Sequence, residues 1–483
     1  MTTTYPMNKR PLLLAILLGL AGAAQAQAPA PAQPAAAPPT ALPADLPPYG
    51  EEQPLPPLDL SARTLANGLT VWVLPRQDGL PKVNYVLAVR GGLAHDPRPL
   101  PGLSNLMAGL LSEGTATRSS VQIAEELAAL GASVGASANS DGVVVSASGL
   151  SSAAGPLAEV FADVARSPAF PANEVELAKA NALQALKASE AQPGYQASKA
   201  MGRVLYGDHP YGNTLPTADS ISATDIAALQ GAHAARFRPD QALLVITGRL
   251  SAEQGFAIAE QAFGDWQAAG PPLPAVAAPA PAAAPSFVLV PRADSVQSAL
   301  RIGRPAFAAG DERAVAAALT STILGGGFDS RLMRNLREEK GYTYGAGSSF
   351  GLRRQGGAFV ASADVRNEVT GAAVGEFLAE FDRMRNEPVP ADELERAKRY
   401  TAGVYLFQNQ LQGSVASALA GNWLLGRPAD YLSTYVAKAR ELTAAQVQAV
   451  AREFFDPKAQ NIVVVGDAAV ATQLQPYGDF STD

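Results

Sequence analysis

A helix with one apolar face is the first element that the hydrophobic pattern predicts. Large apolar side chains recur three and four residues apart just after residue 100, at Leu103, Leu106, Met107, Leu110 and Leu111. This spacing places them on one side of a helix, which then buries that side against a core. A second helix is predicted from Val121 to Leu130, because Ser119 and Gln122 have the spacing of a capping box and Gly131 follows the last turn.

Strands follow these helices in the first half of the chain. Apolar and polar residues alternate over 132–139 and again over 143–149, on either side of Ser140-Asp141-Gly142. Such a pattern is typical of a β-hairpin. Helical spacing dominates again from Leu157 to Leu205. We therefore expect an α+β fold in which the strands pair largely antiparallel and helices pack on one face of the sheet.

The second half of the chain repeats features of the first. In each half a helical segment is followed by a Phe-x-Pro turn and then by an apolar run that ends in glycine. The matching residues, each pair 218 positions apart, are Phe237 and Phe455, Pro239 and Pro457, and Gly248 and Gly466. Each half also opens with a strand candidate, at 83–90 and at 298–303. Chance agreement between two α+β patterns is the alternative, but the repeat favours a duplicated domain.

Segments of biased composition divide the chain. A basic start at Lys9 and Arg10, a short apolar stretch and the small residues of Ala24-Gln25-Ala26 are typical of a cleaved signal peptide. Two Ala- and Pro-rich segments cannot bury enough apolar surface to fold alone. The predicted parts are a signal peptide at 1–26, a tether at 27–57, domains at 58–267 and 286–483, and a linker at 268–285.

The composition narrows the location and the partners. No segment after the signal is apolar enough to span a bilayer, so no transmembrane segment is expected in the mature protein. The signal together with the Ala- and Pro-rich spacer favours a bacterial periplasm, and secretion outside the cell is the alternative. The chain has no cysteine, and its stability therefore depends on core burial. A net charge of -7 without a dense Lys/Arg run argues against nucleic acid as a partner.

Common catalytic motifs give weak signals. The three histidines, His95, His209 and His233, have no Glu or second His at metal-ligand spacing. Ser133 and Ser349 each occupy the centre of a G-x-S-x-G match, but neither lies between a predicted strand and a predicted helix, as a nucleophile elbow requires. A serine hydrolase remains the weakest of the hypotheses considered.

The segment from Leu324 to Phe350 is the most informative. It has the pattern of a glycine-rich turn, a helix from about Asp329 to Glu339, a stop at Gly341 and an alternating strand. This pattern places Arg337 near the helix end and Tyr344 on the strand that returns beside it, and one interpretation is that their side chains converge. The alternative is that Arg337 pairs with a nearby carboxylate and that Tyr344 is an ordinary half-buried strand residue.

The same segment resembles the C-domain signature of the pitrilysin, or insulinase-like, zinc metallopeptidases. In that family a glycine-rich turn, S-R-L and then R-E-x-x-G-x-x-Y occur in this order. The matching residues here are Gly325, Gly326, Gly327, Ser330, Arg331, Leu332, Arg337, Glu338, Gly341 and Tyr344. The resemblance extends over about 58–467. It implies two duplicated α/β sandwich domains of the pitrilysin-like metallohydrolase fold, closed around a peptide-binding chamber.

The comparison with the family also reveals a loss. Active members carry H-x-x-E-H in a first-domain context similar to Gly102–Thr115 of this chain, and a third ligand on a later helix. The resemblance assigns the four metal-site positions to Asn105, Ala108, Gly109 and Ala185, none of which ionises. We expect the first three on one helix face, opposite the leucine stripe. This chain is therefore expected to bind no zinc and to hydrolyse nothing alone.

Members of the family that consist of two polypeptides suggest a role for Arg337 and Tyr344. In them one subunit carries zinc and the other supplies an arginine and a tyrosine. By resemblance, Arg337 and Tyr344 act in trans on a substrate held with the help of Gly325, Gly326, Gly327 and Phe328. The expected partners are peptide substrates and a zinc-bearing H-x-x-E-H subunit. The alternative is a catalytically inactive peptide-binding or scaffold protein of the same fold.

Overall fold

A computed structural model describes residues 58–77, 79–280 and 284–482. The predicted signal peptide, 1–26, and the predicted tether, 27–57, lie outside the described residues. All described residues belong to one compact unit. None of the helices in the described ranges is long and apolar enough to cross a membrane.

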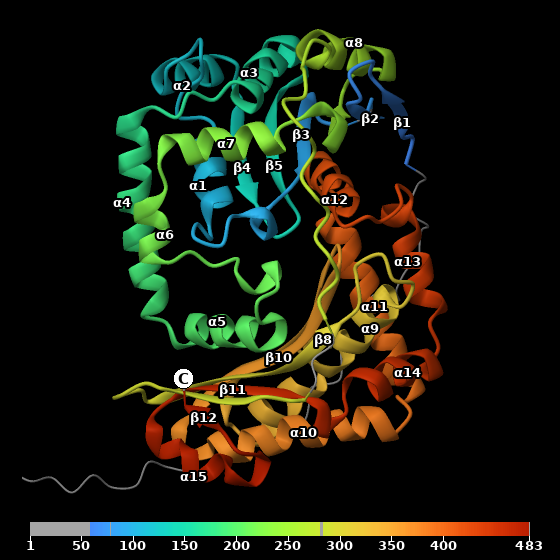
Figure 1. The fold of residues 1–483 in the computed structure, drawn as a ribbon. Helices are drawn as coiled ribbons and strands as arrows, with labels where there is room; N and C mark the ends of the chain where they lie inside the picture. The colour runs from blue at the N-terminus through green and yellow to red at the C-terminus, as the bar shows by residue number, and fades with distance from the viewer. Residues whose placement is uncertain (1–57, 78, 281–283, 483) are drawn as a thin grey trace, which may run out of the picture. The chain divides into compact units, whose positions relative to one another are not determined.

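The first half of the chain forms a six-stranded sheet in the order β1-β2-β6-β3-β5-β4 (Figure 1). Only β2 and β6 pair parallel, and the other neighbours are antiparallel. The strands are β1 (Ser61–Thr64), β2 (Thr70–Pro75), β3 (Lys82–Arg90), β4 (Ser133–Ala138), β5 (Gly142–Leu150) and β6 (Ala242–Gly248). The predicted hairpin is confirmed as β4 and β5, and the strand predicted at 83–90 is confirmed as β3.

The second half forms a sheet in the order β12-β7-β11-β8-β10-β9. Its strands are β7 (Phe287–Pro291), β8 (Gln297–Ala306), β9 (Thr343–Arg353), β10 (Gly356–Arg366), β11 (Asn461–Gly466) and β12 (Ser481–Thr482). The spatial order β7-β11-β8-β10-β9 has the same strand directions as the order β2-β6-β3-β5-β4 of the first sheet. The parallel pair of the first sheet, β2 with β6, corresponds here to β7 with β11. The predicted duplication is therefore present in the topology, and only the outermost strands, β1 and β12, pair differently.

Helices α1 to α8 belong to the first half. They are α1 (Leu103–Leu110), α2 (Ser120–Ala129), α3 (Ala154–Arg166), α4 (Ala172–Glu190), α5 (Pro193–Tyr206), α6 (Ala218–Ala223), α7 (Ile226–Arg236) and α8 (Ala252–Phe263). The capping box predicted for the second helix is confirmed, because the Ser119 side chain accepts from the Gln122 backbone and the Gln122 side chain accepts from the Ser119 backbone.

Helices α9 to α15 belong to the second half. They are α9 (Ala314–Ser321), α10 (Thr370–Asn386), α11 (Ala391–Gln408), α12 (Gln412–Leu424), α13 (Tyr431–Glu441), α14 (Ala444–Phe454) and α15 (Ala471–Leu474). Between α9 and β9, two segments wind as π-helix, Thr322–Gly326 and Met333–Glu339. Such wide turns are rare and occur often at functional sites.

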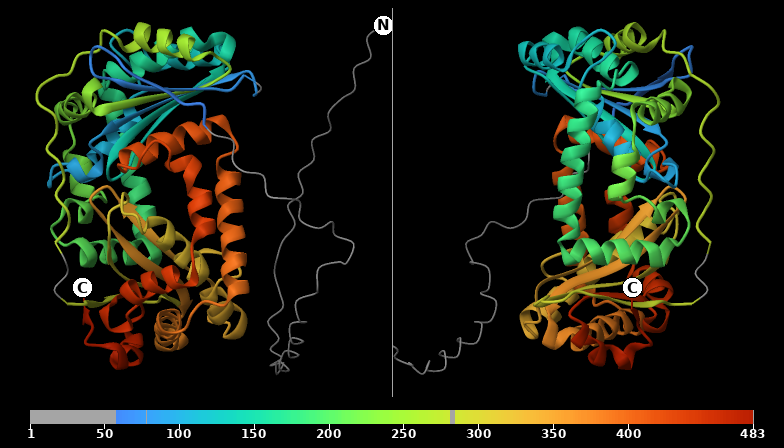
Figure 2. Two further views of the ribbon diagram at one scale, coloured as in Figure 1. Left: turned by 90° about the vertical axis from the view of Figure 1, so that its right-hand side faces the viewer. Right: turned by 60° about the vertical axis from the view of Figure 1, so that its left-hand side comes forward.

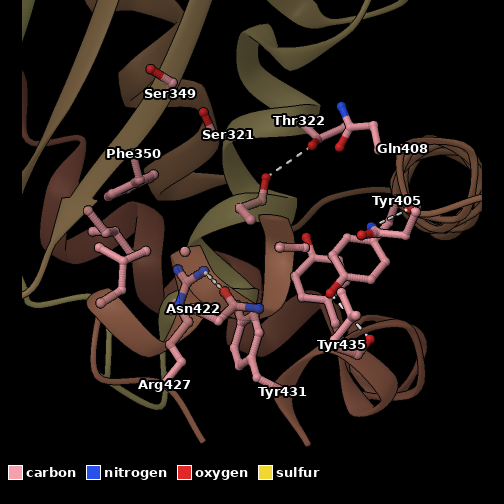
Figure 3. Close-up of a pocket in the computed structure, with 18 of the residues that line it drawn as sticks. Ser321, Thr322, Ser349, Phe350, Tyr405, Gln408, Asn422, Arg427, Tyr431 and Tyr435 are labelled. Atoms are coloured by element: carbon pink, nitrogen blue, oxygen red, sulfur yellow. Dashed lines mark hydrogen bonds between the residues drawn. The ribbon is translucent and has the colours of Figure 1, made fainter. Parts of the chain in front are cut away.

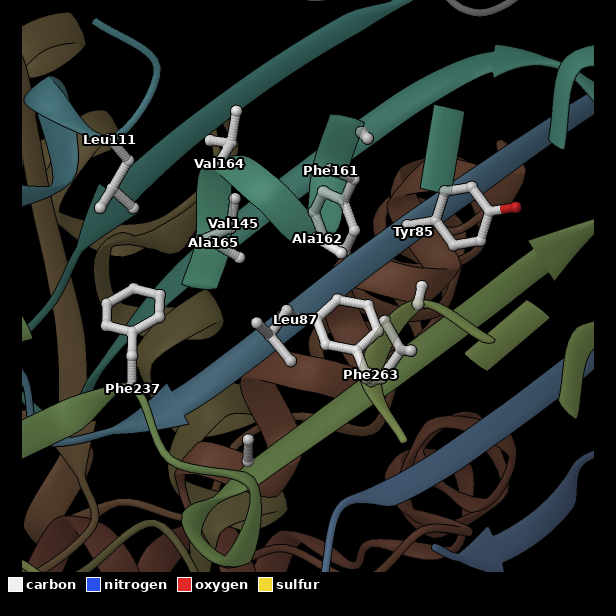
Figure 4. Close-up of a cluster of buried hydrophobic side chains, with 14 of the residues drawn as sticks. Tyr85, Leu87, Leu111, Val145, Phe161, Ala162, Val164, Ala165, Phe237 and Phe263 are labelled. Carbon is white, nitrogen blue, oxygen red and sulfur yellow. The ribbon is translucent and has the colours of Figure 1, made fainter. Parts of the chain in front are cut away.

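Most helices of the first half cover one face of its sheet. Leu87 and Tyr85 on β3 point to this face, where they join Phe161 of α3 and Phe263 of α8 in the core shown in Figure 4. The rings of Tyr85 and Phe161 stack with centroids 5.8 Å apart, and the Tyr85 hydroxyl donates to the Ala154 carbonyl over 2.8 Å. The aromatic pair and the satisfied hydroxyl fix the packing of α3 on the sheet.

The opposite face of each sheet is covered by a helix from the other half. On the first sheet, Val86 and Val245 pack against Val415 and Leu419 of α12. On the second sheet, α5 supplies Met201 against Val463, and Ala197 against Ala299 and Val465. Because both faces of β3 and β6 are covered, these strands are buried at almost every position. Sequence periodicity predicted helices on one face of each sheet only. In the structure the two halves exchange helices, because α5 of the first half covers the second sheet and α12 of the second half covers the first sheet (Figures 1 and 2).

Side chains of the first half hold the described part of the predicted linker. The Nε2 atom of His95 lies 2.9 Å from the Pro274 carbonyl, and that of His209 lies 2.9 Å from the Ala277 carbonyl. Arg238 donates to the Gly270 carbonyl over 2.8 Å. A proline-rich segment has free carbonyl groups but few N–H groups, because proline lacks an N–H. It can therefore be held by side chains that donate hydrogen bonds to its carbonyls. The described linker residues are therefore anchored at several points.

Candidate functional site

The helix that resembles the family's zinc helix is α1, and a buried ion pair fixes its start. Gly102, at φ +88°, precedes the helix. The Asp96 carboxylate accepts from the backbone N–H groups of Gly102 and Ser104 and from the Ser104 hydroxyl. Arg236 of α7 donates to the same carboxylate over 2.9 Å, and both side chains of this pair are buried. The negative charge at the helix N-terminus also suits the helix dipole.

Two of the three predicted zinc-helix positions lie on the exposed side of α1. Asn105 and Gly109 are exposed, as expected. Ala108 is only 3% exposed and belongs to the core of the first half, so its predicted place on the open face is wrong. The reason is that the buried side of α1 is wider than the leucine stripe and includes Ala108. The methyl group of Ala108 can pack in the core because it needs no hydrogen-bond partner.

The fourth position, Ala185, is exposed on α4, which packs beside α1. Of the four positions, only Asn105 has a polar side chain, and an amide oxygen alone is a poor zinc ligand. Throughout the described ranges, no group of three or more His, Cys, Asp or Glu residues is arranged to hold a metal ion. The residues present do not fit zinc.

The three histidines have structural partners. His95 and His209 contact the linker carbonyls, and the Nδ1 atom of His209 accepts from the Tyr211 N–H. His233 stacks on Phe237 with ring centroids 4.3 Å apart and lies 2.9 Å from the Ala165 carbonyl. Burial lowers the pKa of His233 to about 4, so the imidazole is neutral at ordinary pH.

The serines of the G-x-S-x-G matches are not nucleophile elbows. Ser133 is the first residue of β4, and Ser349 lies within β9. Both side chains are exposed, and neither residue joins a strand to a helix. Neither serine therefore has the geometry of a serine-hydrolase nucleophile.

The glycine-rich turn lies directly against β9. A Cβ atom on Gly325 would stand 2.6 Å from the backbone nitrogen of Ser348, so only glycine allows this approach. A Cβ atom on Gly327 would stand 3.3 Å from the ring of Tyr400 on α11. Gly326 is exposed between them, and the turn leads to Phe328, whose side chain is 69% exposed. Close packing of the glycines therefore holds Phe328 out in the open.

The helix after this turn is firmly anchored. Arg331 forms a two-bond ion pair with Glu393 of α11, at 2.9 and 2.7 Å. The Asn335 amide donates to Glu376 and Glu380 of α10. Gly341, at φ +62°, ends the helix, and the Tyr342 N–H returns to the Leu336 carbonyl. The predicted helix, stop and strand are confirmed, but the helix is π-helical from Met333 rather than α-helical.

Arg337 lies between two exposed aromatic rings. Its guanidinium carbon is 4.5 Å from the centroid of Phe328 and 4.9 Å from that of Tyr344. Tyr344 is 88% exposed, which excludes the alternative of a half-buried strand aromatic. Within the described ranges no carboxylate forms an ion pair with Arg337, and its contacts are the two rings. Arg337, Tyr344 and Phe328 thus come together in one cluster.

These features define an α+β fold of two similar halves, and the comparisons with known proteins identify its family. The chain belongs to the insulinase-like M16 peptidase family. Residues 72–219 match the model described as Insulinase (Peptidase family M16), and residues 224–401 match the Peptidase M16 inactive domain. The glycine-rich turn, Arg337 and Tyr344 all lie within the second match.

Individual relatives support this assignment. A crystal structure titled as a peptidase M16 inactive domain from Pseudomonas fluorescens superposes with a TM-score of 0.80 and 28% identity, covering 85% of this chain and 99% of that one. An uncharacterized zinc protease of Bacillus subtilis is 23% identical over 81% of this chain and 95% of its own length. One of Mycobacterium tuberculosis is 28% identical over 62% of this chain, and the match spans 66% of that protein.

Sequence reasoning missed a cavity in the C-terminal half. It is lined by Tyr405, Arg427, Tyr431 and Tyr435, together with small and amide-bearing residues. The signal in the sequence was weak. It consists of Arg427, Tyr431 and Tyr435 at spacings of four residues, and such spacings are common on amphipathic helices. Their convergence with α11 depends on tertiary packing.

Proposed function

We propose that this chain is the zinc-free subunit of an exported two-subunit M16 peptidase, whose zinc-bearing partner hydrolyses peptides. The observation that carries the proposal is Arg337, which has no carboxylate partner in the described ranges and lies between the exposed rings of Phe328 and Tyr344. A guanidinium held in this way by aromatic faces, in a chain whose four candidate ligand positions do not fit zinc, suits recognition of a ligand presented by another subunit.

The chemistry proposed for the pair follows from its donors. The Tyr344 hydroxyl donates a hydrogen bond to the oxygen that becomes negative when a peptide carbonyl is attacked. Arg337 binds a backbone carbonyl of the same peptide or its terminus through its planar donors. Because both rings flank the guanidinium before substrate arrives, little ordering is needed when the complex forms.

Reconstitution tests the proposal. The mature chain is mixed with an H-x-x-E-H homologue from the same organism, and cleavage of a fluorogenic peptide is followed. We expect the mixture to exceed the homologue alone, and Arg337→Ala or Tyr344→Phe to lower that rate by about 10²- to 10³-fold. Arg63→Ala is the matched control, since Arg63 also lies over a ring, 4.1 Å from the centroid of Phe256, but on β1. Equal rates for the parent chain and both variants would contradict the proposal.

A second candidate function is that of an inactive peptide-binding or scaffold protein. The absence of a metal-binding group in the described ranges favours it as much as the first. The two functions differ in what the partner gains. Peptide binding by the chain alone, with no increase in the homologue's activity at any ratio, would favour the scaffold function.

Export to the periplasm is part of the proposal and has its own test. Lys9, Arg10 and Ala24-Gln25-Ala26 support it. The N-terminus of the protein recovered from its native cells is expected to begin at Gln27, as measured by mass spectrometry of the intact chain. Recovery of the uncleaved chain in the cytoplasmic fraction would contradict export.

A further inference from the structure

The concave region in the C-terminal half is large enough for a ligand. Its volume is about 630 Å³, within the range of small-molecule and peptide sites. Its walls are α9, β9, the C-terminal end of α11, α12 and α13, and Figure 3 shows the side chains that line it. Ser349 and Phe350 of β9 form one side.

Three tyrosines form an aromatic wall. The rings of Tyr405 and Tyr435 stack with centroids 4.1 Å apart, and Tyr431 and Tyr435 lie 5.9 Å apart. Burial raises the pKa of all three, that of Tyr435 to about 12, so they remain neutral. The Tyr405 hydroxyl donates to the Leu432 carbonyl. Tyr435 is buried, so the half-buried Tyr405 and Tyr431 supply the aromatic surface that a side chain of the ligand can contact.

The cation beside this wall is Arg427. Its guanidinium carbon lies 4.4 Å from the ring centroid of Tyr431. The Nε atom donates to the Ala309 carbonyl over 3.1 Å, and one terminal nitrogen donates to the Asn422 side-chain oxygen over 3.1 Å. Both acceptors are neutral. In the described ranges no carboxylate forms an ion pair with Arg427, and its charge remains without a counter-charge.

The remaining lining residues carry no opposite charge. Among the described residues that surround the cavity there is no Asp or Glu, and Arg427 is the one charged side chain. The polar groups are hydroxyls and side-chain amides, such as those of Ser349, Gln408 and Asn422. A ligand with a carboxylate gains a charge-assisted hydrogen bond here, whereas a lysine or arginine side chain finds no carboxylate among the lining residues and is repelled by Arg427.

We infer that this cavity binds a carboxylate-bearing peptide segment, with the carboxylate on Arg427 and an adjoining aromatic or aliphatic side chain on the tyrosine wall. The carboxylate comes from the peptide's C-terminus or from an acidic side chain. Describing this ligand as the substrate rests on the proposed function. Binding itself is a property of this chain alone and is measured without a partner.

Isothermal titration of the mature chain with short Gly/Ser peptides that end in Leu-Phe tests the inference. One peptide has a free C-terminus, one a C-terminal amide, and one an amide with an internal Glu. We expect the free acid to bind about 10- to 100-fold more tightly than the amide. If the Glu-containing amide recovers this affinity, acidic side chains serve as well, and if it does not, the C-terminus is the recognised group.

Two variants connect binding to the cavity. Gly421 lines it, and a Cβ atom added there has no neighbour within 4 Å, so the side chain of Gly421→Leu starts in open space and occupies part of the cavity. Gly231 of α7 is equally open, and Gly231→Leu is the matched control. Arg427→Gln removes the charge, with Arg63→Gln as its control.

The expected result is a loss of binding of at least about tenfold in Gly421→Leu and Arg427→Gln only, with unchanged thermal unfolding of Gly421→Leu. Equal affinity for acid and amide, absence of measurable binding, or full binding by Gly421→Leu would overturn the inference. None of these results depends on the Arg337 assay, so the inference and the proposed function can fail separately.

Discussion

Acid should destabilise this protein through His233. The imidazole is buried, stacks on Phe237 and keeps one ring nitrogen 2.9 Å from the Ala165 carbonyl. Burial lowers its pKa to about 4, whereas an unfolded histidine has a pKa of about 6.5. Between these values the unfolded chain binds more protons, so the free energy of unfolding falls as the pH falls. Each pH unit is worth about 1.4 kcal/mol, which gives about 3 kcal/mol in total.

The contribution of His233 to the free energy of unfolding is complete above about pH 6.5 and is lost as the pH falls towards 4. Urea unfolding at about pH 7.5 and pH 5 should therefore differ by about 2 kcal/mol from this group. His233→Gln keeps an N–H donor for the Ala165 carbonyl but does not titrate. The difference in the free energy of unfolding between the parent and His233→Gln is taken at each pH. Contributions from other titrating groups, including His95, cancel in this difference. A parent-minus-variant difference that stays constant between the two pH values would refute the reasoning.

Three further predictions concern packing and the candidate site. Asp96→Asn leaves Arg236 buried without its counter-charge and should cost about 3–5 kcal/mol in urea unfolding, and a cost below 1 kcal/mol would contradict the anchoring of α1. Leu419→Ala on α12 should cost about 2–5 kcal/mol and lower hydrogen-exchange protection in β3 and β6 of the other half, and unchanged protection there would contradict the exchange. Tyr344→Phe should leave the melting temperature unchanged, because its ring is 88% exposed, and a clear drop would mean a structural role.

Local elements were predictable because local rules determine them. The capping box of Ser119 and Gln122 formed as expected, and β4 and β5 met at the predicted hairpin. Apolar periodicity shows that a helix has a buried face but does not identify the surface that covers it. For this reason the packing of α5 on the second sheet and of α12 on the first was not predictable.

The candidate site was predictable in identity but not in detail. Spacing and the family signature identified Arg337 and Tyr344 as the candidate pair but left open whether their side chains meet, and in the structure they do. The ring of Phe328 on the other side of the guanidinium depends on how tightly Gly325 approaches Ser348, which is a tertiary contact. Ala108 was misplaced because a short helix can be buried on more than one stripe. The π-helical turn leaves no mark in apolar spacing.

The exchange of α5 and α12 has a consequence for how such a molecule arose. A single half with this architecture leaves one apolar face of its sheet bare until a second half supplies a helix. The unit that was duplicated is therefore complete only as a pair, as in a domain-swapped dimer. Joining the two copies makes this association independent of protein concentration, because the second half is always present at the effective concentration set by the connecting segment.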